Sequence, residues 1–257
     1  MPFRALPANA VTALALCFGL TGIRFAINQE WPQALACVVI AGVLDGMDGR
    51  IARLLKANSR FGAELDSLSD VTAFGVAPAF ILFLWSLRDA PQPFGWVAAL
   101  ALAVCCALRL ARFNSMLDAD EHPRKAAGFL TGVPAPAAAG LSFLPLYLWL
   151  ISGQEPIFRQ WYVVAPWAIL IALLMISSVA TFGWASLRIR RSWRIFALAG
   201  VALLGAALLT APWLTLTAIS ALYVAMIPVS VAAYRRVRRR RAIQDERAGV
   251  AAGANAG

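Results

Sequence analysis

Charged residues are scarce in this sequence. Only 14% of the 257 residues are Asp, Glu, Lys or Arg, while 61% are hydrophobic and the mean hydropathy is +0.71. Soluble domains carry about a quarter charged residues, so this composition excludes an ordinary soluble protein. Soft metal ligands are scarce too, with one histidine and four cysteines. The cysteines lie in apolar runs without CxxC or other ligand spacing, so we expect them to pack in the interior.

The sequence contains several long apolar runs. A transmembrane helix needs about 20 apolar residues. About eight segments qualify, near residues 9–28, 31–49, 63–86, 95–115, 133–151, 163–186, 195–211 and 213–233. The sequence therefore predicts an all-α, polytopic membrane bundle, in which the last two spans could form one tight hairpin. We find no internal repeat, which argues against transporter folds built from duplicated halves.

Basic residues predict the orientation. The net charge of +10 could suggest nucleic acid binding, but in a membrane protein basic residues first report topology and contact with anionic lipids. If the even-numbered spans end in the cytoplasm, 20 of the 23 Lys and Arg residues fall on that side. We therefore expect a multi-pass protein of the cell membrane with both termini cytoplasmic and no nucleic acid partner. Residues 235–257 form a basic tail that we expect to be disordered.

Four aspartates gather in one short stretch, "DGMDGRIARLLKANSRFGAELDSLSD". Asp45 and Asp48 are three residues apart, and Asp66 and Asp70 are four apart, so each pair shares a helix face. Two helices that meet at a cytoplasmic turn would point these carboxylates at each other. Four such hard oxygen ligands suit one or two Mg²⁺ or Mn²⁺ ions.

The alternative is a solvated loop in which the aspartates form salt bridges with nearby basic residues. The candidate partners are Arg50, Arg53, Lys56 and Arg60. Against this reading, the acids share helix faces. In addition, Asp45 and Asp70 adjoin apolar helix, where a charge costs roughly 2.5–3.5 kcal/mol even on lenient scales. The sequence favours the metal site.

The stretch also carries a recognisable motif of eight fixed residues over 26 positions: Asp45, Asp48, Gly49, Ala52, Arg53, Gly62, Asp66 and Asp70. At every one of these positions the chain resembles the CDP-alcohol phosphatidyltransferase family. The segments "FGAELDSLSDVTAFGVAPA", "ALRLARFN" and "GVPAPAAAG" are similar to its bacterial and archaeal phosphatidylserine synthase branch. The resemblance covers most of residues 7–140, and beyond about residue 150 only hydropathy matches.

The resemblance implies a membrane-embedded transferase over residues 1–234. It would move the phosphatidyl group from CDP-diacylglycerol to the hydroxyl of L-serine and release CMP at the cytoplasmic face. The family uses two divalent cations, Mg²⁺ or Mn²⁺, and forms homodimers among membrane lipids. By resemblance, Asp45, Asp48 and Asp66 are metal ligands, and Asp70 is both a ligand and the general base.

The resemblance also assigns the substrate contacts. Gly49, Ala52 and Gly62 would line the nucleotide site, with Arg53 close to the phosphates. Small residues beside the ligands let a bulky substrate approach the backbone.

Five further polar residues remain open between two interpretations. Arg109, Arg112 and Asn114 in "RLARFN" could bind the lipid phosphate or the serine carboxylate, or could anchor the helix at the cytoplasmic side. Asn9 and Thr12, on one face of the first span, could contact the nucleotide or cap the helix.

A loop near the site is also ambiguous, because Arg124 and Lys125 could close over the site or be plain loop charge.

Two rival functions remain. Another member of the family would use glycerol 3-phosphate, inositol phosphate or choline as the alcohol. A cation transporter would also hold acidic residues in a membrane, but nearer the midplane and along a continuous polar pathway.

Overall fold

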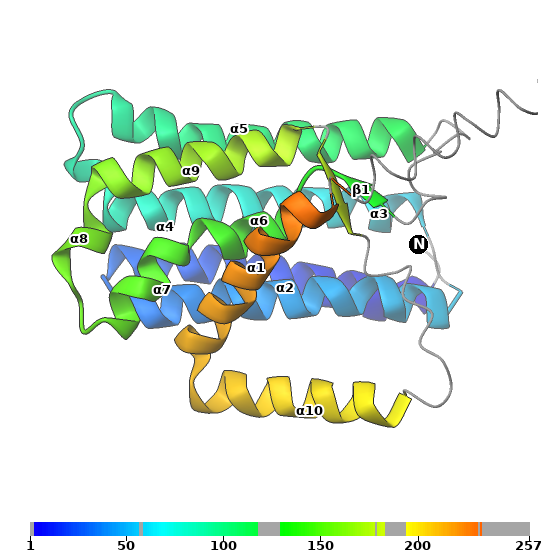
Figure 1. Cartoon of the computed structure of the whole chain (residues 1–257). Helices are drawn as coiled ribbons and strands as arrows, with labels where there is room; N and C mark the ends of the chain where they lie inside the picture. The colour runs from blue at the N-terminus through cyan, green and yellow to red at the C-terminus, as the bar shows by residue number, and fades with distance from the viewer. Residues whose placement is uncertain are drawn as a thin grey trace, which may run out of the picture.

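The computed structural model is a bundle of long helices, and it describes residues 3–56, 59–117, 129–177, 179–182, 194–230 and 232 (Figure 1). The N-terminal half consists of η1 (Phe3–Ala5), α1 (Leu6–Ile27), α2 (Trp31–Leu54), α3 (Arg60–Asp70), η2 (Val71–Val76), α4 (Ala77–Trp85), η3 (Leu87–Asp89) and α5 (Phe94–Leu117).

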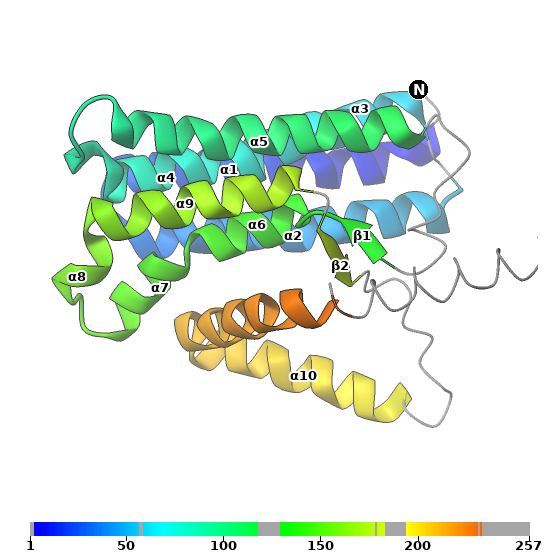
Figure 2. The same cartoon turned by 45° about the horizontal axis from the view of Figure 1, so that its top comes forward.

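The C-terminal half has shorter helices and one small ribbon. It consists of β1 (Phe129–Thr131), α6 (Ala135–Ser142), α7 (Leu144–Ile151), α8 (Pro156–Arg159), α9 (Trp161–Ile176), β2 (Ala180–Phe182), α10 (Arg194–Thr210) and a last helix over Pro212–Ser230. The strands β1 and β2 pair antiparallel, with Phe129 opposite Phe182 (Figure 2). The sequence did not predict this ribbon.

The predicted fold class is confirmed, since the described chain is that of a polytopic helical membrane protein. Four helices are long and apolar enough to cross a membrane: Leu6–Ile27, Arg60–Trp85, Phe94–Ser115 and Pro212–Ser230. Two shorter apolar helices cover Trp161–Ile176 and Leu198–Thr210. Within the described residues the helices occur in the order predicted for the spans. That eight spans cross the membrane stays a prediction. The last two helices adjoin at Ala211, where Thr215 Oγ1 donates to Ala207 O at 3.1 Å.

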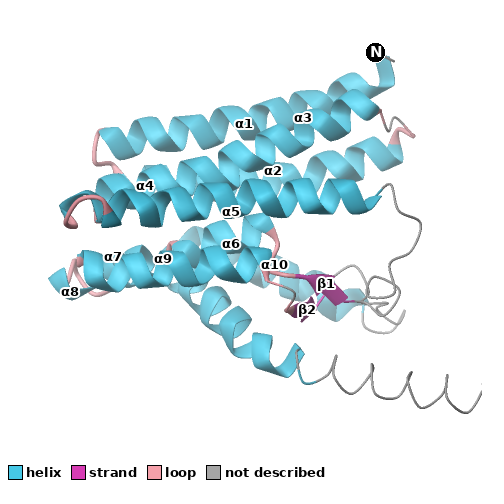
Figure 3. Ribbon diagram, turned by 90° about the horizontal axis from the view of Figure 1, so that it is seen from above, coloured by secondary structure: helices cyan, strands magenta, loops and turns pink. Residues whose placement is uncertain are grey.

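The ends of four N-terminal segments meet at one end of the bundle. The beginning of α1, the end of α2, the beginning of α3 and the end of α5 all lie at the right of Figure 1. Figure 3 shows α1, α3 and α2 side by side at this end. The turn predicted between the two aspartate pairs is present, because α3 begins after Ser59, whose hydroxyl accepts from Gly62 N at 3.0 Å.

Small residues allow these helices to pack closely. A Cβ added to Gly19 of α1 would lie 2.8 Å from Ala73 Cα in η2, and one added to Gly75 would lie 2.9 Å from Cys106 Cβ in α5. Lipid tails are as apolar as the helices, so tight van der Waals contact takes over much of the role of the hydrophobic effect in a membrane. Helices α1 and α5 therefore hold η2 from two sides.

The segment η2 is a π-helix that begins directly after Asp70. A π-turn inserts one residue relative to α-helical register, and such segments recur at functional sites. Here it separates α3, whose polar residues include Asp66 and Asp70, from the apolar α4. The π-helix therefore marks the boundary between the polar α3 and the apolar α4.

Two predictions fall on residues outside the described part of the chain. They are the basic tail over 235–257 and the loop that carries Arg124 and Lys125.

The contact between Gly19 and Ala73 yields a prediction about stability. We expect Gly19→Ala to lower the melting temperature of the detergent-solubilised protein by several degrees, since overpacking costs about 1–3 kcal/mol. Gly200→Ala on α10 is the matched control, because a Cβ there would meet no atom within 4 Å. It should leave stability unchanged or raise it slightly. Equal melting temperatures for the two variants would contradict the close packing.

Candidate active site

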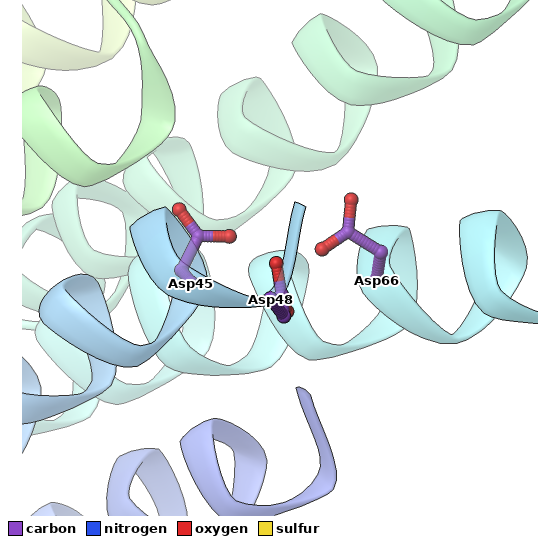
Figure 4. A group of neighbouring side chains, drawn as sticks. All are labelled: Asp45, Asp48 and Asp66. Carbon is purple, nitrogen blue, oxygen red and sulfur yellow. The ribbon is translucent and has the colours of Figure 1, made fainter. Parts of the chain in front are cut away.

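Three aspartates converge between α2 and α3. Asp45 and Asp48 project from α2 and Asp66 from α3, and one oxygen atom from each lies within 4.8 Å of the other two (Figure 4). Asp48 is the most buried of the three, with 6% of its surface exposed. The predicted helix pair has therefore brought residues 21 positions apart in sequence into one cluster.

Asp70 lies beside this cluster. Its carboxyl group is within hydrogen-bonding reach of Asp45, and its charge interacts with Asp66 and with the guanidinium of Arg109 on α5. Among the described residues it is not part of the three-way group. The fourth predicted ligand is thus next to the cluster, on the side toward α5.

The salt-bridge interpretation of the aspartate stretch is wrong for the described residues. Their one ion pair is that of Arg88 with Asp89, at 3.8 Å and far from this stretch in sequence. Arg53 turns its Nε to the Gly49 carbonyl at 2.9 Å instead. The clustered carboxylates therefore have no direct cationic partner from the basic residues around them in sequence.

The donor set fits a hard divalent cation. Carboxylate oxygens are the ligands that Mg²⁺ and Mn²⁺ prefer. Ligands at about 2.1 Å from one octahedral ion lie at most about 4.2 Å apart, so the three carboxylates need only a small adjustment to share one. Asp45, Asp48 and Asp66 could hold such an ion, and Asp70 adjoins Asp45 where a second could bind.

Helix α1 contributes a hydroxyl to the cluster. Thr12 Oγ1 donates to Asp48 Oδ2 at 2.6 Å and lies 3.1 Å from Ala8 O. Ser69 Oγ of α3 donates to the backbone oxygen of Thr12 at 3.2 Å. Thr12 was expected to cap α1 or to contact the nucleotide. It lies well inside α1, which begins at Leu6, so helix capping is excluded.

A cavity of about 210 Å³ opens beside Asp48 and Asp66, and we call it the polar cavity because half of its lining residues carry polar side chains. Its lining comprises Ala8, Asn9, Thr12, Asp48, Gly49, Ala52, Ser59, Gly62, Ala63 and Asp66. The predicted or possible contacts of the nucleotide and its phosphates were Asn9, Thr12, Gly49, Ala52, Arg53 and Gly62. All of these except Arg53 are in this lining. Ala8, Ser59 and Ala63 were not predicted as site residues. Of these, Ser59 could have been found, because it lies at the turn predicted between the aspartate pairs.

The two glycines of the cavity differ in what they allow. A Cβ on Gly49 would meet no atom within 4 Å, so this glycine leaves space. A Cβ on Gly62 would lie 2.9 Å from Asn9 Oδ1, so Gly62 permits the close approach of α1. Asn9 is also inside α1, which excludes capping, and its Nδ2 is buried without a hydrogen-bond partner in the described structure.

The polar residues of α5 separate into different environments. Arg109 faces Asp70, and its buried Nε has no hydrogen-bond partner in the described part of the chain. Arg112 donates from Nη1 to the Ile176 carbonyl at the end of α9, at 3.3 Å. Asn114 Nδ2 donates to Ser67 Oγ on α3 at 2.8 Å. The two arginines therefore do not form one clamp.

An apolar cavity of about 340 Å³ lies on the other side of the cluster. It is enclosed by α2, η2, α6, α7 and the last helix, and Gly42, Phe74 and Tyr223 are among its lining residues. Gly42 lies one helical turn before Asp45, and Phe74 lies about one turn after Asp70. Along α2 the carboxylates thus stand between an apolar and a polar cavity.

Comparison with known proteins agrees with this arrangement. A family model described as CDP-alcohol phosphatidyltransferase matches residues 5–176, and one described as CDP-alcohol phosphatidyltransferase 2 matches residues 192–228. The similarity therefore extends further along the chain than the motifs predicted.

Relatives named CDP-diacylglycerol–serine O-phosphatidyltransferase occur in several organisms. The one from Mycobacterium tuberculosis is 35% identical over 93% of this chain and 82% of its own length. The one from Mycobacterium leprae is 38% identical over 87% of this chain and 73% of its own. The one from Helicobacter pylori is 34% identical over 66% of this chain and 69% of its own.

The first family model spans more than half of the chain and includes every aspartate of the cluster. Together with the relatives that run along most of its length, this shows that the chain belongs to the CDP-alcohol phosphatidyltransferase family.

Proposed function

We propose that this protein transfers the phosphatidyl group of CDP-diacylglycerol to the hydroxyl of L-serine, in a reaction that depends on divalent cations. The observation that carries the proposal is the convergence of Asp45, Asp48 and Asp66 within 4.8 Å, between a polar and an apolar cavity. Phosphoryl-type transfer depends on positioning and on neutralising charge. Cations held by Asp45, Asp48 and Asp66 would supply positive charge that stabilises the leaving group.

The two cavities suit the two parts of the donor. The polar cavity, with Gly49, Ala52 and Gly62 in its lining, takes the cytidine end of CDP-diacylglycerol. The apolar cavity next to Gly42 and Phe74 takes part of an acyl chain. The diphosphate that joins the two ends then lies at the aspartates. Arg53 directly follows Ala52 of the polar cavity's lining, so its guanidinium could approach the phosphates from the end of α2.

Two observations support serine as the acceptor. The curated relatives described above carry serine in their names. Furthermore, Arg109 is a half-buried guanidinium beside Asp70, while Arg112 is engaged with the Ile176 carbonyl. One guanidinium suits the single carboxylate of serine. Glycerol 3-phosphate or inositol phosphate would bring a dianion that needs a larger basic pocket, and choline would bring no anion at all.

In the proposed reaction Asp70 takes the proton of the serine hydroxyl. The serine oxygen then forms a bond to the phosphorus that carries the diacylglycerol. The bond from this phosphorus to the bridging diphosphate oxygen breaks, and CMP leaves with the electron pair. Asp70 is suited to this role because it lies beside the metal-binding group and next to Arg109, which would orient the incoming serine.

We also propose the setting of the enzyme. The site lies at the end of the bundle where α1 begins and α2 ends (Figure 1). By the distribution of basic residues this end faces the cytoplasm of a multi-pass protein in the cell membrane. The family resemblance adds a homodimer. A cation transporter is disfavoured because the described acids outside the aspartate stretch form no pathway: Glu30 and Glu155 lie between helices, and Asp89 ends the short η3.

The acceptor is tested by turnover. Purified protein in detergent with CDP-diacylglycerol, Mg²⁺ or Mn²⁺ and labelled L-serine should form labelled phosphatidylserine and release CMP in equal amounts. Glycerol 3-phosphate, inositol phosphate and choline should give little product. Preference for one of these three would assign another acceptor while leaving the metal site intact.

The metal dependence is tested by removing ligand charge. Asp45→Asn and Asp66→Asn should each lower turnover by at least 100-fold, because each replaces a charged hard ligand with a neutral amide. Exhaustive chelation of the wild type should give the same loss, and added Mg²⁺ or Mn²⁺ should restore it. Asp89→Asn, far from the cluster in sequence, serves as the control with unchanged turnover. Activity that survives chelation would overturn the metal dependence.

The role of Asp70 is tested by separating binding from chemistry. An amide at position 70 can still offer an oxygen to a cation, but it cannot take up the serine proton. Asp70→Asn should therefore bind CDP-diacylglycerol within a few-fold of wild type in the presence of the divalent cation, yet lose at least 100-fold in turnover. Equilibrium binding and single-turnover assays measure the two effects. A variant with robust turnover would remove the general-base role.

A further inference from the structure

Thr12 has two acceptors within reach of its one hydroxyl proton. The first is the carbonyl of Ala8, one turn earlier in α1, at 3.1 Å, and the second is Asp48 Oδ2 at 2.6 Å. Both partners of the shorter contact are buried, with 5% of Thr12 and 6% of Asp48 exposed. A bond from a hydroxyl to a carboxylate is shorter and stronger than one to a neutral carbonyl, so the proton belongs to Asp48.

Other threonines on helices of this protein behave differently. Thr21, on the same helix as Thr12, donates to Cys17 O at 2.7 Å, and Thr72 donates to Leu68 O at 2.9 Å. This i−4 contact satisfies a helical threonine without outside help. Thr12 has the same contact available and reaches across to α2 as well. The Thr12 hydroxyl therefore does not need Asp48 as an acceptor, and the contact with Asp48 calls for another explanation.

We propose that Thr12 is a positioning residue that fixes the carboxylate plane of Asp48 for cation binding, an inference that rests on the proposed metal site. The hydrogen bond occupies one lone pair of Oδ2 and stops rotation of the carboxylate. The remaining lone pairs stay directed toward the space shared with Asp45 and Asp66. Polar groups that hydrogen-bond to a ligand in this way orient it, and their loss typically weakens metal affinity 10–100-fold.

The position of Thr12 is itself fixed by α3. Ser69 Oγ donates to the Thr12 backbone oxygen at 3.2 Å, and Ser69 is 3% exposed. Ser69 lies between Asp66 and Asp70 in sequence. Helix α3 therefore presents Asp66 and, through Ser69, also fixes the position of Thr12, which orients Asp48. Helix α1 thereby ties the two carboxylate-bearing helices together at the level of the cluster.

The test compares Thr12→Val, which keeps the branched shape and loses the hydroxyl, with Thr12→Ser, which keeps the hydroxyl. Thr21→Val on the same helix is the matched control. Affinity for Mn²⁺ is measured without substrates by electron paramagnetic resonance on detergent-solubilised full-length protein. We expect Thr12→Val to bind Mn²⁺ 10–100-fold more weakly, and Thr12→Ser and Thr21→Val to stay within about 3-fold of wild type.

A second readout separates orientation from general damage. The Mn²⁺ concentration for half-maximal turnover should rise in Thr12→Val by the same factor as the dissociation constant. Turnover of Thr12→Val should recover as the Mn²⁺ concentration is raised, which general damage to the fold would not allow. If Thr12→Val does not yield folded protein, Thr12→Ala replaces it in the comparison with Thr12→Ser.

The outcomes distinguish this inference from the proposed function. Wild-type Mn²⁺ affinity in Thr12→Val, together with its loss in Asp45→Asn, would overturn the role of Thr12 and leave the metal site standing. Wild-type affinity in both variants would overturn the metal site itself. Equal weakening in Thr12→Val and Thr21→Val would show a general effect of α1 and would also overturn the inference.

Discussion

Repulsion among the aspartates is the constraint on which the rest of this structure depends. Asp45, Asp48 and Asp66 bring oxygen atoms within 4.8 Å of one another. At an effective dielectric constant of about 20, two like charges about 5 Å apart repel by roughly 3 kcal/mol. None of the described basic residues forms an ion pair with them. Without a cation, the protein therefore has to hold these side chains together through rigid packing and hydrogen bonds.

Rigid packing comes from the smallest residues. Gly19 lets α1 approach Ala73, Gly75 lets η2 approach Cys106, and Gly62 lets α3 approach Asn9. Each contact lies within two turns of a carboxylate or on the helix that orients one. In a bilayer, close contact between backbones is a main source of helix association. A helix wedged apart by one methyl group would change the distances among the carboxylates, so the small residues serve the site as well as the fold.

The sequence predicted the helical membrane fold, a turn between the two aspartate pairs and the convergence of the aspartates, because hydropathy and helical spacing determine these features directly. It predicted Asn9 and Thr12 only as ambiguous polar residues. The contact from Thr12 to Asp48 depends on the crossing of α1 and α2, which no local pattern encodes. Arg109 and Arg112 share a helix face by spacing. However, α9 ends beside Arg112, which donates a hydrogen bond to the Ile176 carbonyl there. The π-helix after Asp70, over the residues VTAFGV, likewise could not be predicted from hydropathy or helical spacing.

The charge around the site bears on how many cations it takes. Four carboxylates face the position proposed for the diphosphate, and Arg109 is the one guanidinium among the described residues whose charge is seen to interact with them. One divalent ion would leave most of this negative charge uncompensated. Two ions, one among Asp45, Asp48 and Asp66 and one on the side of Asp70, would bring the site with its diphosphate close to neutrality. From this count of charges we propose that the site takes a pair of cations instead of a single one.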